Sequence, residues 1–322
     1  MHARSIVRSL QVDEATARGT PLVALESTVI AQGLPWPENL ETARAMEAVV
    51  REAGAEPSTI AVLDGEIRLG LAPDEILEIA AVAAPRTAPG AGPRPWVKAN
   101  RRDLSAIVAA GGCAATTVSA TLWIARRAGL APGVMATGGL GGVHRDAGTT
   151  FDVSTDLDEL ARADGMLVVC SGMKSILDLP ATLESLETRG VPVVGYRTGE
   201  LPGFVARTSG LALEHRVDSP EEVARLVLAH RSLGLPGAVV LVQPVPEADA
   251  IDPGLLARAI DGALAEARRR GISGKPLTPF LLGAVRDATG GQSLRANRSL
   301  LVANARLAGE VALAMVGVRA DC

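Results

Sequence analysis

The chain has 322 residues, of which 48% are hydrophobic, and its 32 basic and 36 acidic residues give a formal net charge of −4. This length and composition suffice for a well-buried core, and we interpret residues 1–322 as a single globular domain. Aromatic residues make up only 2% of the chain. Without a positive field or a set of stacking rings, we expect no binding to a nucleic-acid polymer.

Cysteine usage and hydropathy limit the expected compartment. Cys113, Cys170 and Cys322 lie far apart without Cys-x-x-Cys spacing, which argues against a disulfide framework and a zinc site. The first ten residues lack the apolar core of a signal peptide, and no apolar run reaches the roughly 20 residues that span a bilayer. We therefore expect a cytoplasmic protein without a membrane anchor.

The N-terminal part reads as a strand, a helix and a hairpin. Residues 21–25 form an apolar run that ends at Glu26, which predicts a strand that delivers a carboxylate to a sheet edge. Pro37-Glu38-Asn39 then opens a segment with apolar residues at helical spacing, which predicts a helix that closes at Gly54. Asp64-Gly65, a dipeptide that tight turns prefer, divides the apolar segment 59–69 and predicts a short antiparallel ribbon.

A lysine ends the next predicted strand. A helix that starts at Ala72 breaks into a proline- and glycine-rich loop, 84–95, which fits either a mobile lid or a simple connector. Residues 96–98 predict a short strand that ends in Lys98, followed by a helix over 101–111. Three basic residues within five positions fit an anion site and a solvated helix start about equally well.

A glycine-rich loop follows. Residues 114–127 predict a mostly apolar helix, and residues 133–136 predict a strand that leads into the loop 137–145. Its four glycines allow close backbone approach to a ligand, and successive N–H groups can form an anion-binding nest. The loop matches neither common phosphate fingerprint. A phosphate loop and a plain glycine-rich turn therefore both remain open.

Two carboxylates and two hydroxyl groups come directly after this loop, from Asp152 to Asp156. Asp156 can simply cap the helix that runs through Leu157 and Leu160. Asp152, between Phe151 and Val153, is harder to explain in this way, and a carboxylate pair near a phosphate loop suits a divalent cation. The spacing alone gives no complete set of metal ligands.

A second lysine follows the most apolar run of the chain. Residues 167–170, between Gly165 and Gly172, predict a strand that is buried on both faces of a parallel sheet. Ligands bind at the carboxyl ends of such strands, so Lys174 is a candidate amine nucleophile, and burial would favour its neutral form. Alternatively, Lys174 pairs with Asp178 and only begins the next helix.

The remaining chain alternates helices and strands with short glycine and proline joints. This order predicts an α/β fold, a largely parallel sheet covered by helices on both faces (α/β/α), with a small antiparallel ribbon. The predicted elements are a helix over 183–188, strands over 191–196 and 211–213, a helix over 221–230, a strand over 238–242 and a helix over 255–270.

The last predicted helix, 293–315, has two asparagines on its apolar face. Asn297 and Asn304 are seven residues apart, so they lie on the same side as Leu300 and Leu307. Amide groups on an apolar face must form hydrogen bonds, either to protein or to a ligand.

Six blocks in this order resemble the pseudouridine-5′-phosphate glycosidase family. The resemblance covers nearly the whole chain, from about residue 20 to 315. It implies reversible cleavage of the carbon–carbon glycosidic bond of pseudouridine 5′-phosphate to uracil and ribose 5-phosphate, with a divalent cation, usually Mn²⁺. It also implies an α/β/α core and a homotrimer. The blocks are 24–28, 98 with 101–104, 136–145, 151–157, 174–178, and 297 with 304–307.

The same resemblance implies a role for individual residues. Lys174 resembles the nucleophile that forms an imine with the ring-opened ribose, Glu26 the proton donor and Asp152 the metal ligand. Thr155 stands where the family commonly has alanine, so its contacts are not fixed by the resemblance. The resemblance implies that three residues contact the phosphate: Lys98, Thr137 and His144. It implies that five others contact the rest of the substrate: Val118, Ser154, Thr155, Asp156 and Asn297.

The reaction explains why these groups are needed. Ordinary glycosidases expel oxygen or nitrogen with two carboxylates, and carbon is a much poorer leaving group. We hypothesise that Glu26 protonates the ribose ring oxygen while neutral Lys174 adds to C1′, and that the imine nitrogen then takes part in cleavage as uracil C5 is protonated. A carboxylate on the amine would oppose this, so we expect Asp178 to point elsewhere.

Two other functions are compatible with parts of the pattern. One is an N-glycosidase or lyase that acts on another sugar phosphate. The other is a sugar-phosphate sensor without catalytic activity, although a sensor needs neither Glu26 nor Lys174.

Overall fold

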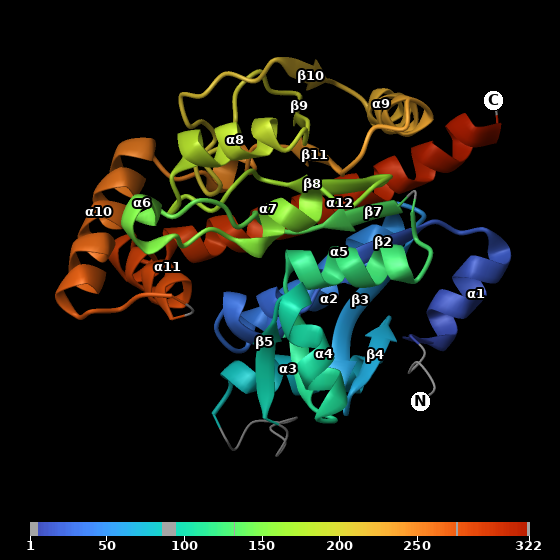
Figure 1. Cartoon of the computed structure of the whole chain (residues 1–322), viewed down its shortest axis with the longest axis horizontal. Helices are drawn as coiled ribbons and strands as arrows, with labels where there is room; N and C mark the ends of the chain where they lie inside the picture. Colours follow the sequence, from blue (N-terminus) through green and yellow to red (C-terminus); the bar gives the residue numbers. More distant parts are fainter. Residues whose placement is uncertain (1–5, 86–94, 132, 275, 321–322) are drawn as a thin grey trace.

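The structure, a computed structural model, describes residues 6–85, 95–131, 133–274 and 276–320. An 11-stranded, mostly parallel sheet runs through these residues, and helices cover both of its faces (Figure 1). The predicted α/β fold is thereby confirmed. Most of the loop predicted over 84–95 lies outside the described residues.

The strands follow the order β1-β4-β3-β2-β7-β8-β11-β9-β10, with β6 beside β3 and β5 beside β6. All pairs are parallel except β3 with β4 and β3 with β6. The strands are β1 (Val7–Arg8), β2 (Leu22–Glu26), β3 (Glu56–Leu63), β4 (Glu66–Leu69), β5 (Trp96–Ala99), β6 (Cys113–Thr116), β7 (Gly133–Ala136), β8 (Met166–Cys170), β9 (Val193–Tyr196), β10 (His215–Val217) and β11 (Val239–Val242).

The helices form a layer on each face of the sheet. α12 packs against β7, β8 and β2 together with α2 and α9, whereas α5 and α7 pack together on the other face (Figure 1). The helices are α1 (Leu10–Arg18), α2 (Glu38–Glu52), α3 (Pro73–Ala80), α4 (Leu104–Ala109), α5 (Val118–Arg127), α6 (Ala147–Thr150), α7 (Thr155–Leu160), α8 (Leu179–Thr188), α9 (Pro220–Ser232), α10 (Pro253–Arg269), α11 (Leu277–Ala288) and α12 (Gln292–Ala320).

The predicted antiparallel ribbon is confirmed as β3 and β4, but a third strand extends it. Residues 113–116 form β6, which pairs with β3 and β5, and the helix α5 begins only at Val118. The prediction of a helix from residue 114 was therefore wrong. β6 is buried along its whole length, and a continuous apolar run has no periodicity that separates strand from helix.

A second prediction was wrong near the sheet edge. The strand expected over 211–213 lies instead at residues 215–217, as β10, and Ala212 forms only an isolated bridge with Glu200. His215 and Arg216 are exposed on this edge strand. A pattern based on apolar residues therefore missed it.

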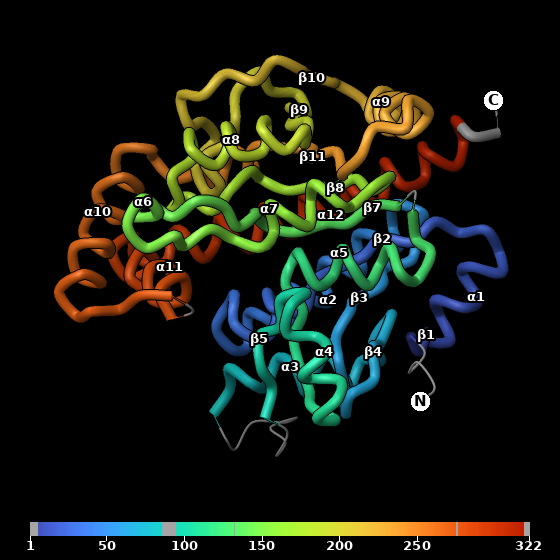
Figure 2. Tube along the Cα trace, viewed as in Figure 1, coloured from blue at the N-terminus to red at the C-terminus, as the bar shows by residue number. Residues whose placement is uncertain are grey.

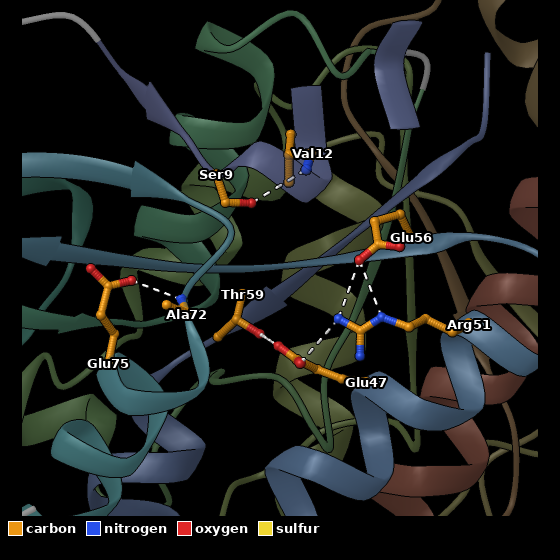
Figure 3. A network of polar contacts seen from close by, with 8 residues as sticks. All are labelled: Ser9, Val12, Glu47, Arg51, Glu56, Thr59, Ala72 and Glu75. Carbon is orange, nitrogen blue, oxygen red and sulfur yellow. Dashed lines mark hydrogen bonds and ion pairs between the residues drawn. The ribbon is translucent and has the colours of Figure 1, made fainter. Parts of the chain in front are cut away.

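A buried polar network ties α2 to β3 (Figure 3). The Thr59 hydroxyl donates to Glu47 Oε1 at 2.7 Å, and Arg51 forms ion pairs with Glu47 at 3.4 Å and Glu56 at 3.2 Å. Burial raises the pKa of Glu47, and the Thr59 hydroxyl and the charge of Arg51 oppose that rise. The contacts fix the helix that precedes β3 against the sheet.

The helix α12 is long and apolar enough to cross a membrane by length and composition. Half of its most apolar window is buried inside the protein, and it runs along the sheet beside α2 and α9. This packing is that of a core helix, although its length and composition contradict the expectation that no apolar segment is long enough to span a bilayer.

α10 and α11 form a helical pair at one side of the molecule, beside α6 (Figure 2). Two ion pairs connect α10 with the segment around α6: Arg145 to Asp261 at 3.1 Å and Arg268 to Asp146 at 2.8 Å. These helices therefore stand next to the loop that follows β7, where the candidate site lies.

Candidate active site

Three adjacent strands bring the key groups together at their carboxyl ends. Leu25 of β2 pairs with Ala136 of β7, and Ala136 pairs with Val169 of β8. Glu26 ends β2, Thr137 follows β7, and the turn after β8 leads to Lys174. Parallel strands all end at one edge of a sheet, so this register places the three side chains around one site.

A cavity of about 140 Å³ occupies this edge, and we call it the central cavity. Nine of the eleven residues predicted from the sequence line it. Thr155 and Asp152 line a larger adjoining space instead. The nine are Glu26, Lys98, Val118, Thr137, His144, Ser154, Asp156, Lys174 and Asn297.

Glu26 is 8% exposed and is held by the Thr137 hydroxyl, which donates a hydrogen bond to its carboxylate. Burial raises the pKa of Glu26 above its ordinary value, while the charge of Lys174 and the bond from Thr137 act in the opposite direction. The net rise favours a protonated carboxyl group, as a proton donor requires. Thr137 was predicted to contact phosphate, but its hydroxyl faces the proposed acid.

Asn304 of α12 fixes the backbone that carries Thr137. Its side chain is fully buried, its amide nitrogen donates to the Thr137 carbonyl at 2.8 Å, and its amide oxygen accepts from Gln243 at 2.9 Å. Ser171, at the end of β8, lies within hydrogen-bond distance of the same amide. One amide therefore links the segments that carry Thr137 and Lys174.

Lys174 lies beyond the end of β8, and its backbone N–H donates to the Leu140 carbonyl at 3.1 Å. Asp178 caps α8 by accepting from the Ala181 N–H at 3.0 Å. The described residues contain no ion pair between Lys174 and Asp178. The prediction that Asp178 points away from the amine is confirmed.

The glycine-rich loop bonds mainly to its own surroundings. Backbone N–H groups of the loop donate to Gly172, Thr182, Asp152 and Asp156. None of its four glycines has a positive φ. Glycine is required at position 139 because a Cβ there would lie 2.7 Å from the Phe204 ring. Close packing therefore explains why glycine stands at position 139.

Asp156 has a different role from the predicted helix cap. Ser154 caps α7 by accepting from the Asp156 N–H, and the Asp156 carboxylate accepts from the N–H groups of Ser119 and Gly141 at 3.1 and 2.9 Å. Its burial at 5% exposure and its two distant partners show that Asp156 fixes α5 and the glycine loop around the cavity.

An adjoining space, which we call the charged chamber, opens from the central cavity past Lys98 and His144. Burial lowers the pKa of His144. The charge of Asp152, whose Oδ2 atom lies 3.9 Å from His144 Nε2, acts in the opposite direction. The charged groups that line the chamber are Lys98, Arg102, His144, Arg145, Asp146, Asp152 and Arg268.

Asp152 was expected to hold a metal ion. Its side chain is 34% exposed toward the charged chamber, and no three His, Cys, Asp or Glu side chains converge anywhere in the described ranges. This donor set fits a hydrated divalent cation held by one carboxylate and completed by water or substrate oxygens. It does not fit a site built from protein ligands alone.

Several residues of the central cavity were not predicted from the sequence. Gln32 lies on a π-helical turn, Val29–Gly33, directly after the strand that carries Glu26, and Phe204 lies in a turn with φ +65°. Thr278, Pro279 and Leu282 belong to α11, which was not predicted. π-Helical turns often occur at functional sites, but no pattern in the sequence predicted this turn.

The fold and the cavity together define an α/β protein with an enzyme-type site, in which an amine and a buried carboxyl group face one space beside cationic groups. A model of the family described as Indigoidine synthase A like protein matches residues 11–314. The chain belongs to this family, and its predicted kinship with the pseudouridine-5′-phosphate glycosidases is confirmed.

Relatives resemble it over almost their whole length. A pseudouridine-5′-phosphate glycosidase of Caldanaerobacter subterraneus subsp. tengcongensis is 48% identical, with 96% of both chains covered. One of Methylobacterium nodulans is 50% identical, with 97% of this chain and 88% of the relative covered.

Two solved structures have the same fold. The prealnumycin C-glycosynthase AlnA, in complex with ribulose 5-phosphate, is 39% identical with a TM-score of 0.86, with 98% of this chain and 99% of that chain covered. An indigoidine synthase A-like protein of Thermotoga maritima is 36% identical with a TM-score of 0.82, and 97% of both chains is covered.

The two asparagines of α12 provide a matched pair for a stability test. Asn304→Leu leaves the Thr137 carbonyl and the amide of Gln243 without a partner, so we expect it to lower the free energy of unfolding by about 2–3 kcal/mol. Asn297→Leu, on the same helix but facing the cavity, should change it by less than about 0.5 kcal/mol. Urea denaturation measures both, and equal effects would contradict the role of Asn304.

Proposed function

We propose that the protein cleaves pseudouridine 5′-phosphate reversibly to uracil and ribose 5-phosphate, through an imine between Lys174 and the ring-opened ribose. One observation carries this proposal: Glu26 and Lys174, from the ends of β2 and β8 on either side of β7, line the same cavity, and a charged chamber adjoins it. Relatives that are 48–50% identical bear the name of this activity.

The ligand class has separate support. A structural neighbour that is 39% identical is a C-glycosynthase in complex with ribulose 5-phosphate, a pentose 5-phosphate. Lys98 and His144 stand where the central cavity meets the charged chamber, and Arg102 lies further out. A phosphate at this end would be held far from the reacting carbon, where its binding energy positions the sugar.

In the proposed first step, the Lys174 amine attacks C1′ in its neutral form. The bond between C1′ and the ring oxygen breaks, and protonated Glu26 gives its proton to that oxygen. The raised pKa of Glu26 supports this role, because burial disfavours the carboxylate. This step opens the sugar and leaves the uracil carbon attached to C1′.

In the proposed second step, the nitrogen, which became positively charged on attack, first returns a proton to the Glu26 carboxylate, and its lone pair then forms a double bond to C1′. The bond from C1′ to uracil C5 breaks, and its electron pair takes that proton from Glu26 at C5, which releases neutral uracil. Water then hydrolyses the imine to ribose 5-phosphate and the free amine. The covalent intermediate thus divides one difficult carbon–carbon cleavage into easier steps.

The divalent cation, expected to be Mn²⁺, belongs to the proposal, with Asp152 as its protein ligand. When bound, it would supply positive charge to substrate oxygens. A cytoplasmic location and a homotrimer are also proposed.

Turnover tests the proposed function directly. With pseudouridine 5′-phosphate, the ultraviolet absorbance should change as uracil is released, and uridine 5′-phosphate should give no reaction. Lys174→Ala should lower kcat by at least about a thousandfold. Lys98→Met should raise KM about tenfold while kcat changes less, because it removes a phosphate contact.

Cleavage of uridine 5′-phosphate alone would assign the protein to the N-glycosidases. Binding of ribose 5-phosphate without any turnover would instead make it a sensor.

The pH dependence tests the role of Glu26. The Thr137 hydroxyl lowers the pKa of Glu26, so Thr137→Val should raise that pKa further. Glu26 would then keep its proton to a higher pH, and the alkaline loss of kcat/KM should move to higher pH. The pH profile of cleavage measures the shift. An unchanged alkaline limb, or one displaced to lower pH, would remove Glu26 from the role of proton donor, and Thr149→Val, an exposed threonine, is the control.

A further inference from the structure

The central cavity has two ends of different character. At one end it shares Lys98 and His144 with the charged chamber. At the other end it continues into a second space, which we call the apolar chamber. Among the described residues that line this chamber only Arg286 is charged, and it forms an ion pair with Asp287 at 2.8 Å. The residues that line both the central cavity and the apolar chamber are Gln32, Gly33, Ile176, Phe204, Pro279, Leu282 and Asn297. None of these seven is charged, so the two ends suit different parts of one ligand.

Phe204 lies at the apolar end, in the lining of both the central cavity and the apolar chamber. Its backbone adopts φ +65°, a conformation that is costly for a residue with a large side chain. Its ring lies against Gly139, where a Cβ would come within 2.7 Å of the ring. Two unusual features of the chain thus hold this ring at the cavity, and aromatic faces stack well on planar rings.

Gln32 and Asn297 provide the polar groups of this end. Both line the central cavity and the apolar chamber, and neither side chain bonds to another of the described residues. The turn that carries Gln32 is itself fixed, because Asn39 donates to the Ile30 carbonyl at 2.7 Å. A carboxamide offers two N–H donors and one acceptor, so these two groups can read the edge of a planar ligand.

We propose that this end of the central cavity is the subsite for the leaving base, and that Gln32 is a residue that determines base specificity. The inference rests on the proposed function and extends it to the substrate's second half. Uracil is flat and uncharged, and its edge alternates N–H and C=O groups. It therefore matches the ring of Phe204 and the amide of Gln32, whereas the phosphate matches the charged chamber.

The order of groups along the cavity supports this assignment. Lys174 lines only the central cavity, between the two ends, and it is the group that would hold C1′. A nucleotide carries its phosphate and its base on opposite sides of the sugar. With the phosphate toward Lys98, the base must extend toward Gln32.

The synthetic direction separates the two subsites. Uracil and ribose 5-phosphate are supplied as separate substrates, and a KM is measured for each with the wild-type protein and with Gln32→Leu. This variant keeps the size of the side chain but removes its hydrogen-bonding groups. KM for uracil should rise about tenfold, while KM for ribose 5-phosphate stays within about twofold. Gln11→Leu, on an exposed face of α1, is the matched control and should change neither.

The possible results separate a failure of the proposed function from a failure of the base subsite. If the wild-type protein makes no pseudouridine 5′-phosphate and cleaves none, the proposed function itself fails. If the wild-type protein is active but Gln32→Leu leaves KM for uracil unchanged, or raises both KM values equally, the base subsite is overturned. Partial recovery of KM for uracil in Gln32→Asn, which restores an amide, would support it further.

Discussion

The site depends on one constraint, namely that a carboxyl group almost removed from water is held at the end of a parallel strand beside a lysine. β2, β7 and β8 are neighbours, so their carboxyl ends deliver Glu26, Thr137 and the turn before Lys174 to one place. Burial favours the protonated acid, and Thr137 and Lys174 limit that effect. Asn304 fixes the backbone behind these groups, and so the geometry follows from the packing of α12 against the sheet.

The two ends of the central cavity also differ in charge. Cationic groups gather on one side of Lys174, where α10 and the segment around α6 approach each other. On the other side, the residues that line both the central cavity and the apolar chamber are uncharged. This separation suits a substrate with a charged phosphate and a neutral base. The electrostatics of the chain therefore indicate how a nucleotide would lie, as well as where it would bind.

Much of this site could be predicted from the sequence because its residues stand at the ends of apolar runs. Glu26 and Lys174 each follow a buried strand, and such positions meet at one sheet edge once the strands are parallel. A resemblance to a known family then supplied roles for Lys98, His144 and Asn297.

The remainder depends on tertiary contacts that leave no local pattern. Gln32 matters because a π-helical turn carries it to the cavity, and Phe204 because Gly139, 65 residues earlier in the chain, leaves room for its ring. The sequence required partners for Asn304 but could not identify Thr137 and Gln243 as those partners. β6 escaped prediction because a uniformly apolar segment fits strand and helix equally well.

The imine is the central claim, and chemical trapping tests it most directly. The chain has three lysines, Lys98, Lys174 and Lys275, so peptide mapping can assign an adduct without ambiguity. Ribose 5-phosphate and borohydride should attach one reduced sugar phosphate to the wild-type protein, at Lys174 alone. An active protein that gains no mass under these conditions, or that gains it at Lys98, would contradict the account.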